Sequence, residues 1–195
     1  GVNEMKTILV VGTADTKGDE LLYIRRQIEA AGATAVIMDV GVLGEPDFEP
    51  EYSKYDVAEA ANTRNDDIIA LGDEDKAMAK QSEGAAELAR RLQEAGKIDG
   101  FLAIGGTMAT DLALDVANAL PTGFPKLIAS TVAFSPMVPP NRIPADLRMI
   151  VWSAGLYGLN TICKAILNQA VGAVVGACQA SRAVESVRPM VGITS

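Results

Sequence analysis

The sequence contains no histidine, and this absence removes several kinds of chemistry. Without imidazole there is no Ser-His-Asp or Cys-His catalysis, no histidine metal ligand and no histidine proton shuttle at neutral pH. The side-chain acids and bases that remain are Asp, Glu, Lys, Cys and Tyr. Any reaction carried by these residues must therefore use carboxylates, amines, thiols or phenols.

Positive charge and cysteine are also scarce. Lys and Arg number 17 against 25 Asp and Glu, and the net charge of −8 disfavours attraction to nucleic acid or anionic membranes. The two cysteines, Cys163 and Cys178, fall in one predicted helix, where fifteen residues separate them by about 22 Å, too far for a disulfide within it. Free thiols and the lack of a signal peptide predict a cytoplasmic protein without nucleic-acid or membrane partners.

The length and the apolar content predict a folded chain that needs no disulfide or metal for stability. With 195 residues, 49% of them hydrophobic, the chain is expected to form one domain or two small lobes with a substantial core. Residues 1–4, ahead of Met5, are interpreted as a tag remnant. Residues 190–195 form an apolar run that we interpret as the start of a further domain, so the α/β domain itself is expected over residues 5–189.

Short apolar runs alternate with longer segments of helical period. This alternation predicts an α/β fold, a Rossmann-like three-layer arrangement of a parallel sheet with helices on both faces. The expected strands are residues 7–11, 35–40, 100–104, 126–131 and 149–151, with 190–194 a further candidate. The expected helices are residues 17–31, 73–97, 107–120 and 155–180, and residues 44–54 are expected to be an exposed loop.

The last predicted helix, residues 155–180, is long and largely apolar. A membrane-spanning interpretation is disfavoured by the polar residues that interrupt it, which are Asn160, Lys164, Asn168, Gln169 and Gln179. Its small residues indicate close packing against another helix, either within the core or in a homodimer. These residues are Gly172, Ala173, Gly176 and Ala177.

The turn after the first predicted strand has the composition of a phosphate-binding turn. In α/β proteins such a turn lies at the carboxyl edge of the sheet, where backbone N–H groups at a helix start face an incoming anion. Glycines permit close backbone approach, hydroxyls can donate, and Lys17 can neutralise a phosphate. The residues concerned are Gly12, Thr13, Thr16, Lys17 and Gly18. The alternative is that Thr16 only caps the helix, with Asp19 completing a capping box.

A second turn of the same kind, Gly105, Gly106 and Thr107, follows another predicted strand. If the two strands flank a topological switch point, both helix N-termini converge on one ligand, and a polyphosphate is the obvious candidate. The alternative is tight packing of strand against helix that requires glycine. Neither turn matches the dinucleotide or P-loop spacing.

Polar residues follow other predicted strands at the same edge. Asp39, with Gly41 beside it, is placed to accept hydrogen bonds from ribose hydroxyls, or else is merely solvated. Ser130 and Thr131 end a strand ahead of a proline-rich loop at residues 136–144, which is a lid or a plain connection. A magnesium ion shared by the carboxylates of three residues is a further hypothesis; these are Asp15, Asp39 and Asp111.

Four blocks of the sequence together resemble a known family. GTADTKGDE, GKIDGFLAIGGT, LPTGFPKLIASTVA and GLNTICKAILNQAVGAVVGA occur in this order, and they resemble the bacterial and plant family named for the tobamovirus resistance protein of tomato. The resemblance implies an N-terminal ATP-binding α/β domain, a TIM-barrel-like second domain and a dimer. It places the nucleotide site on Gly12, Thr13, Asp15, Thr16 and Lys17 and on Gly105, Gly106 and Thr107.

This chain departs from the family pattern at the expected site. Relatives tend to read GGSGGT where residues 105–110 read GGTMAT, and the proline-rich passage after Thr131 is longer. The expected ligand is therefore ATP, with or without Mg²⁺, or else a ligand that is shifted in the site or different from ATP. Two other functions stay open: an enzyme for a small phosphorylated or carboxylated substrate with Lys17 or Asp15 as acid or base, and a dimerising interaction module without a ligand.

Overall fold

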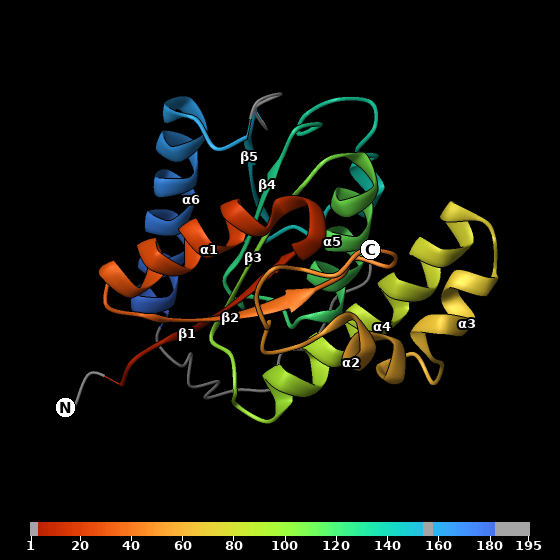
Figure 1. Ribbon diagram of the computed structural model, residues 1–195. Helices are drawn as coiled ribbons and strands as arrows, with labels where there is room; N and C mark the ends of the chain where they lie inside the picture. Colours follow the sequence, from red (N-terminus) through yellow and green to blue (C-terminus); the bar gives the residue numbers. More distant parts are fainter. Residues whose placement is uncertain (1–3, 154–157, 182–195) are drawn as a thin grey trace, which may run out of the picture.

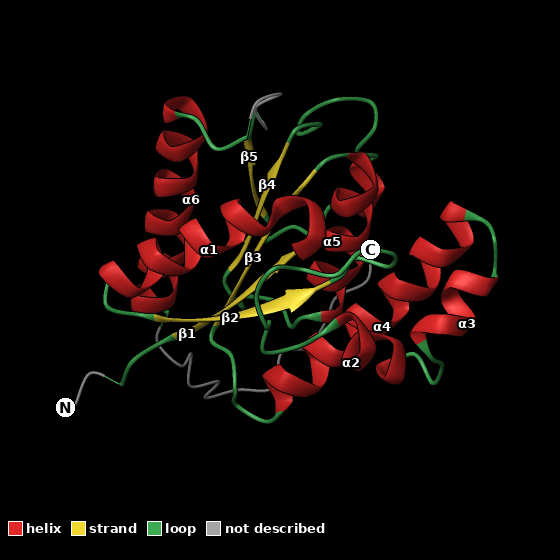
Figure 2. Cartoon of the chain, viewed as in Figure 1, coloured by secondary structure: helices red, strands yellow, loops and turns green. Residues whose placement is uncertain are grey.

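A five-stranded parallel sheet forms the centre of the computed structural model, which describes residues 4–153 and 158–181. The sheet order is β2-β1-β3-β4-β5, and every pair of neighbouring strands is parallel. Helices cover both of its faces (Figures 1 and 2). The predicted Rossmann-like three-layer α/β fold is confirmed. The strands are β1 (Thr7–Gly12), β2 (Thr34–Asp39), β3 (Gly100–Gly105), β4 (Lys126–Ser130) and β5 (Arg148–Val151).

The two faces of the sheet carry different helices. One hydrophobic cluster joins alternate strand residues such as Ile8 and Val10 to α1 and α6. The other joins Leu9 and Val11 to α2, α4 and α5. Because successive strand residues point to opposite faces, both faces are apolar, as expected for strands covered on both sides. The helices are α1 (Ala14–Ala30), α2 (Lys54–Ala60), α3 (Asn65–Ala70), α4 (Glu74–Glu94), α5 (Thr107–Ala119) and α6 (Thr161–Ala180).

The segment between β2 and α4 contains two helices that the sequence interpretation missed. Short helices of six and seven residues give too little periodicity to be recognised, although α2 has a capping box. In that box Asp56 N–H donates to Ser53 Oγ at 3.2 Å and Ser53 N–H donates to Asp56 Oδ2 at 2.7 Å. Lys54, expected to end an exposed loop, instead begins α2 and is 3% exposed.

The last helix begins later than expected, at Thr161, where the Asn160 Oδ1 accepts from the Cys163 N–H at 2.9 Å. Gly172, Ala173 and Gly176 are exposed, so the prediction that they pack in the core is wrong. Their role in a homodimer stays a prediction. Both cysteines are buried and free, as expected. Residues 1–3 of the segment interpreted as a tag remnant, residues 1–4, and the segment 190–195 lie outside the described residues.

Within the described ranges, α6 is the one helix long and apolar enough to cross a membrane, by length and composition only. One side of α6 is buried against β3, β4 and α1, including Leu167, Val171 and Val174. The core helix of a folded protein has the same length and composition, so this finding alone is weak evidence for a membrane span.

The close contact of α2 with α4 provides a test of this packing. A methyl group at Gly84 of α4 would overlap the carbonyl oxygen of Val57 in α2, whereas one at Gly172 of α6 would meet nothing within 4 Å. We expect Gly84→Ala to lower the free energy of unfolding by about 1–3 kcal/mol. Gly172→Ala, also in a helix, should raise it by about 0.5–1 kcal/mol. Urea denaturation of both variants measures the difference, and equal effects would contradict the described packing.

Candidate functional site

The chain reverses its winding direction between the neighbouring strands β1 and β3. The helix that follows β1, α1, packs on one face of the sheet, and the helix that follows β3, α5, packs on the other. Val11 pairs with Ala103, so the turns that begin at Gly12 and Gly105 lie at the same edge on adjacent strands. This is the topological switch point at which open α/β sheets leave a crevice. The expected proximity of the two turns is therefore confirmed.

The first turn is fastened by a buried carboxylate. Asp39, at the end of β2, accepts hydrogen bonds at Oδ1 from the N–H of Ala14 at 3.0 Å and of Gly41 at 2.8 Å. Asp39 is 1% exposed, so the expectation of a solvated acid is wrong. Its Oδ1 holds the start of α1 against the turn after β2. A contact with ribose stays a prediction.

Burial is the main influence on the Asp39 carboxyl. Loss of hydration raises its pKa above the ordinary value, and the nearby Asp15 carboxylate adds to this effect. The two backbone N–H donors and Lys54 act in the opposite direction without cancelling it. The charged form of Asp39 is thus held in place by hydrogen bonds at a cost in desolvation.

Helix α1 begins earlier than the sequence indicated. Its first residue is Ala14 and its N-cap is Thr13, whose side chain makes no capping bond. The prediction that Thr16 caps the helix with Asp19 in a capping box is therefore wrong; instead the Thr16 hydroxyl lies 2.6 Å from the Thr13 hydroxyl. The first turn of α1 is irregular, because Lys17 has φ −121° and ψ 26° inside the helix.

Residues 41–44 form a turn that lies against Asp15. Three side chains from different helices hold its carbonyl groups: Lys54 Nζ donates to Gly44 at 2.8 Å, Asn65 Nδ2 to Val42 at 3.2 Å and Gln81 Nε2 to Gly41 at 3.0 Å. A Cβ at Gly41 would lie 3.0 Å from an oxygen of both Asp15 and Asp39. Packing is therefore a sufficient reason for glycine at this position.

The second turn contains two glycines with different surroundings. A Cβ on Gly105 would overlap the side chain of Ala109, so close approach of β3 to α5 requires glycine there. A Cβ on Gly106 would meet only Thr131 Oγ1, at 3.6 Å, an ordinary contact. Gly106 is the N-cap of α5 and provides no side-chain cap, and Thr107 is exposed. Packing therefore gives no reason for glycine at position 106.

The end of β4 completes the edge beside Gly106. Ser130 is buried, its hydroxyl lies 2.6 Å from that of Thr110 in α5, and it accepts from the N–H of Val132 at 3.1 Å. Ser130 therefore shapes the turn from inside. Thr131 is exposed, and its N–H donates to the Gly105 carbonyl at 3.1 Å. Of this predicted pair, only Thr131 has a side chain at the surface.

Trp152, which directly follows β5, is a functional candidate that the sequence interpretation missed. Its backbone N–H donates to the Ser130 carbonyl at 3.0 Å. The centre of its ring lies 5.5 Å from the ammonium nitrogen of Lys17. The side chain is fully buried, yet its indole Nε1 has no hydrogen-bond partner among residues 4–153 and 158–181. In the described part of the chain, Lys17 makes no ion pair. Trp152 is the sole tryptophan of the sequence, and this was the only feature of the sequence that could have drawn attention to it.

The three-carboxylate magnesium site is not formed. Asp15 and Asp39 are neighbours, but Asp111 forms an ion pair with Arg142, which also bonds to Asp115 at 2.6 Å. Within residues 4–153 and 158–181, no group of three or more Asp, Glu, Cys or His could hold a metal. The proline-rich loop is thus tied to α5 through Arg142, part of a short turn of 3₁₀ helix (Pro140–Arg142).

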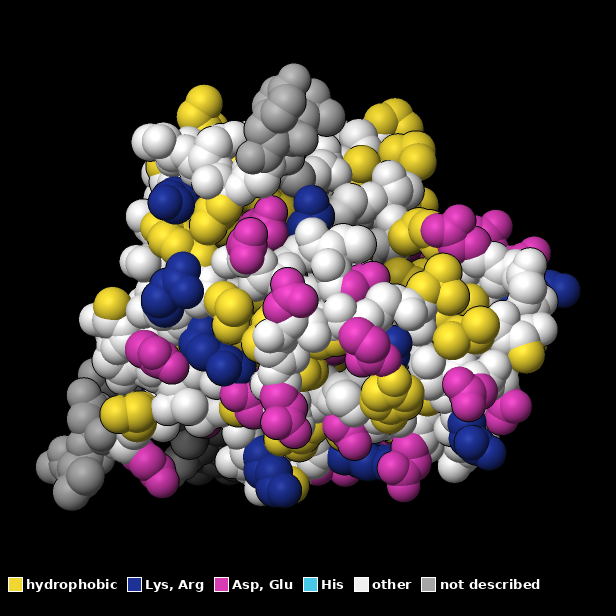
Figure 3. Space-filling model, viewed as in Figure 1, with side chains coloured by type: hydrophobic (Ala, Val, Ile, Leu, Met, Phe, Trp, Pro, Cys, Tyr) yellow, Lys and Arg dark blue, Asp and Glu magenta, His cyan; other side chains and the backbone are white. Residues whose placement is uncertain are grey.

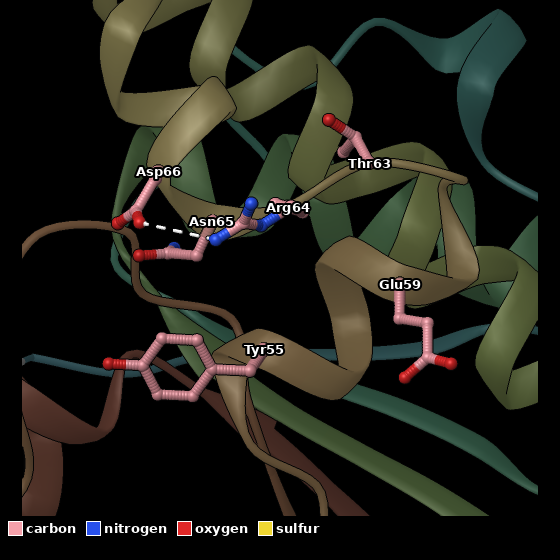
Figure 4. Close-up of a pocket in the computed structure, with 6 residues that line it drawn as sticks. All are labelled: Tyr55, Glu59, Thr63, Arg64, Asn65 and Asp66. Atoms are coloured by element: carbon pink, nitrogen blue, oxygen red, sulfur yellow. Dashed lines mark ion pairs between the residues drawn. The ribbon is translucent and has the colours of Figure 1, made fainter.

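Two surface cavities lie away from the sheet edge. One, of about 340 Å³, is lined by α2, α3 and the turn between them (Figure 4), where Arg64 and Asp66 form an ion pair of 3.8 Å. Its lining residues are Tyr55, Glu59, Thr63, Arg64, Asn65 and Asp66. The other, of about 380 Å³, lies over α4 and includes Arg90, Arg91 and Glu87. These charged groups pair with one another, and neither cavity contains a predicted site residue.

The fold and the switch point define a doubly wound α/β protein. The chain belongs to the family described as "Uncharacterised protein family (UPF0261) N-terminal domain", which matches residues 6–183. A UPF0261 protein of Brucella suis is 54% identical over 96% of this chain and 45% of that protein. One of Clostridium tetani is 33% identical over 97% of this chain and 47% of its own length. The chain thus spans about half the length of these relatives.

The comparison with the tomato protein gives a more distant match. A protein of Solanum lycopersicum described as "ToMV susceptible protein tm-1(GCR26)" is 25% identical over 90% of this chain and 26% of that protein. The resemblance drawn from the four sequence blocks thus holds at low identity. The family to which the chain belongs is UPF0261.

The role assigned to Asp39 can be tested by substitution. Asp39→Ala leaves two buried N–H groups without an acceptor, so we expect the free energy of unfolding to fall by about 2 kcal/mol. Asp39→Asn keeps an acceptor oxygen and removes the buried charge, so its loss of unfolding free energy should be smaller.

The raised pKa of Asp39 predicts a pH dependence of stability. The folded protein holds this proton to a higher pH than the unfolded chain does, so the wild-type free energy of unfolding should fall as the pH rises from the ordinary pKa of an aspartate through the raised pKa of Asp39. Asp39→Asn should lack this decrease. Urea titrations from pH 3 to pH 8 measure both effects; equal losses in the two variants would contradict the assignment.

Proposed function

We propose that this chain binds a phosphate-bearing ligand, ATP in the first instance, at the sheet edge between β1 and β3. The observation that carries the proposal is the meeting of two helix N-termini on adjacent strands at the switch point: α5 has no side-chain cap, and α1 has none from its own N-cap residue, although Asp39 accepts from its Ala14 N–H. Backbone N–H groups in the first turn of a helix attract anions because they lack helical partners and lie at the positive end of the helix dipole.

The surroundings of the two turns support an anion site. In the described part of the chain, the N–H groups of Thr107, Met108 and Ala109 have no acceptor. Gly106 has no side chain to cover them, and a Cβ there would meet only Thr131 Oγ1, at 3.6 Å. Among the described residues, Lys17 supplies a positive charge with no carboxylate partner, and its ammonium nitrogen lies 5.5 Å from the centre of the Trp152 ring, whose buried Nε1 has no acceptor there. A phosphate group is the ligand that such donors fit.

The position of Asp15 makes the proposed binding dependent on magnesium. Asp15 is an exposed carboxylate in the first turn of α1, so it repels a bare phosphate. Mg²⁺ is commonly held by one or two carboxylates together with substrate phosphates. Asp15 is the residue that would contact an ion brought in with ATP. Phosphoryl transfer depends mainly on positioning and charge neutralisation, so hydrolysis would require little beyond these groups.

Calorimetric titration with ATP, ADP and NAD, each with and without Mg²⁺, tests the proposal. We expect heat from ATP that is larger and tighter with Mg²⁺, accompanied by a change in Trp152 fluorescence. Lys17→Ala should weaken ATP binding about tenfold, the effect of one charge-assisted hydrogen bond. Gly106→Ala should also weaken it, with only a small loss of stability: the added methyl would meet nothing closer than 3.6 Å, although alanine is a poorer N-cap than glycine.

Lys76→Ala is the matched control, since Lys76 is an exposed lysine at the start of α4, away from the switch point. It should leave ATP binding unchanged. Folded wild-type protein that gives no heat with any of the three nucleotides would overturn the proposal. Phosphate release above background in the same samples would assign hydrolysis to this chain.

A further inference from the structure

The loop after β4 holds one aromatic ring out in the solvent. Phe134 is 77% exposed, and its backbone lies in the left-handed region at φ 61°. Both properties are unfavourable, because a bulky residue with positive φ is strained and an exposed ring gains nothing from burial. Hydrophobic side chains gather at the upper right of Figure 3, where this loop lies in Figure 1, and the adjacent Met137 is 59% exposed.

Hydrogen bonds on both sides of Phe134 fix the loop in this conformation. The Ser135 N–H and hydroxyl donate to the Val132 carbonyl at 3.1 and 2.6 Å. The Val138 N–H donates to the Ser135 carbonyl at 3.0 Å, and Val138 is buried in the core. The loop therefore starts and ends on anchored residues, and the ring is presented by a rigid support.

The loop starts at the turn proposed to bind phosphate. Thr131 bonds to Gly105 and lies beside Gly106, and Phe134 follows it three positions further along the chain. Three residues of backbone span at most about 11 Å, so the Cα of Phe134 lies within that distance of the Cα of Thr131. The sugar and phosphate chain of a nucleotide extends over this distance. Residues 130–141 include no charged side chain. The loop therefore offers no charge that would favour a charged group of a ligand over a neutral aromatic ring.

We infer that Phe134 is a stacking surface for the base of a bound nucleotide. The inference rests on the proposed function and narrows the ligand class: a phosphorylated compound with an aromatic base is preferred over one without a ring. Stacking uses the faces of both rings and requires no hydrogen-bonding group on the protein. Phe134 would then contribute affinity for the base, while the turns at Gly106 and Lys17 hold the phosphates.

The test compares ATP with inorganic tripolyphosphate, both with Mg²⁺, on wild type and Phe134 variants by calorimetry. Phe134→Ala should weaken ATP binding about tenfold and leave tripolyphosphate binding unchanged. Phe134→Tyr, which keeps a ring, should bind ATP within about twofold of wild type. Phe134→Leu, which keeps an apolar side chain without a ring, should behave as Phe134→Ala does. Each variant removes or alters only an exposed group, so its fold is expected to be retained, which circular dichroism checks.

The outcomes separate this inference from the proposed function. Unchanged ATP affinity in Phe134→Ala, or an equal loss for ATP and tripolyphosphate, would overturn the stacking role while the phosphate site stands. Wild-type protein that binds neither compound would overturn both. A change in sedimentation coefficient of Phe134→Ala with unchanged ATP affinity would assign the ring to a contact between copies of the chain, and would also overturn the inference.

Discussion

The reversal of winding between β1 and β3 is the constraint on which the arrangement of this edge depends. A parallel sheet whose connections all ran the same way would place successive helices on one face and cover the strand ends between them. Here α1 and α5 diverge to opposite faces from adjacent strands, so the first turns of both helices are left beside one another. The carboxyl edge is thereby the place where backbone donors are least covered, without any specialised side chain being required.

The fold holds this edge in place with buried polar groups rather than with apolar packing alone. Asp39 fastens α1 to the turn after β2, and Gln81 from α4 holds the carbonyl of Gly41 in the same turn. The buried Thr110–Ser130 pair joins α5 to the end of β4. Buried hydrogen bonds fix position more strictly than apolar contacts, because a small displacement leaves a donor or acceptor unpaired. The end of β2 therefore keeps a defined position relative to the start of α1, and the end of β4 relative to α5, a requirement for any site shared between these elements.

The sequence was sufficient for the sheet and insufficient for the details of the site. All five strands were predicted, because strands buried on both faces are apolar throughout, and the strand-turn-helix pattern at Gly12 and Gly105 located the edge. The short helices α2 and α3 were missed, since six or seven residues carry little periodicity. Asp39 looked like a ligand-binding or solvated acid because a sequence does not show which backbone groups a carboxylate will meet. The contact of Lys17 with Trp152 joins residues 135 positions apart in the chain, and no local pattern could indicate it.

A chain of net charge −8 can still bind an anion, because charges far from the site are screened by salt. The Debye length is about 8 Å at physiological ionic strength, and the effect of a helix dipole is confined to its first turn. The charged groups closest to the bound anion therefore determine whether it is attracted or repelled. Asp111 and Asp115 of α5 are each paired with Arg142, which reduces their repulsion, and Lys17 remains without an acidic partner in the described part of the chain. The exposed Asp15 is then the carboxylate at the edge with the least compensation, so the local balance of charge turns on a single residue and on whether a cation accompanies the ligand.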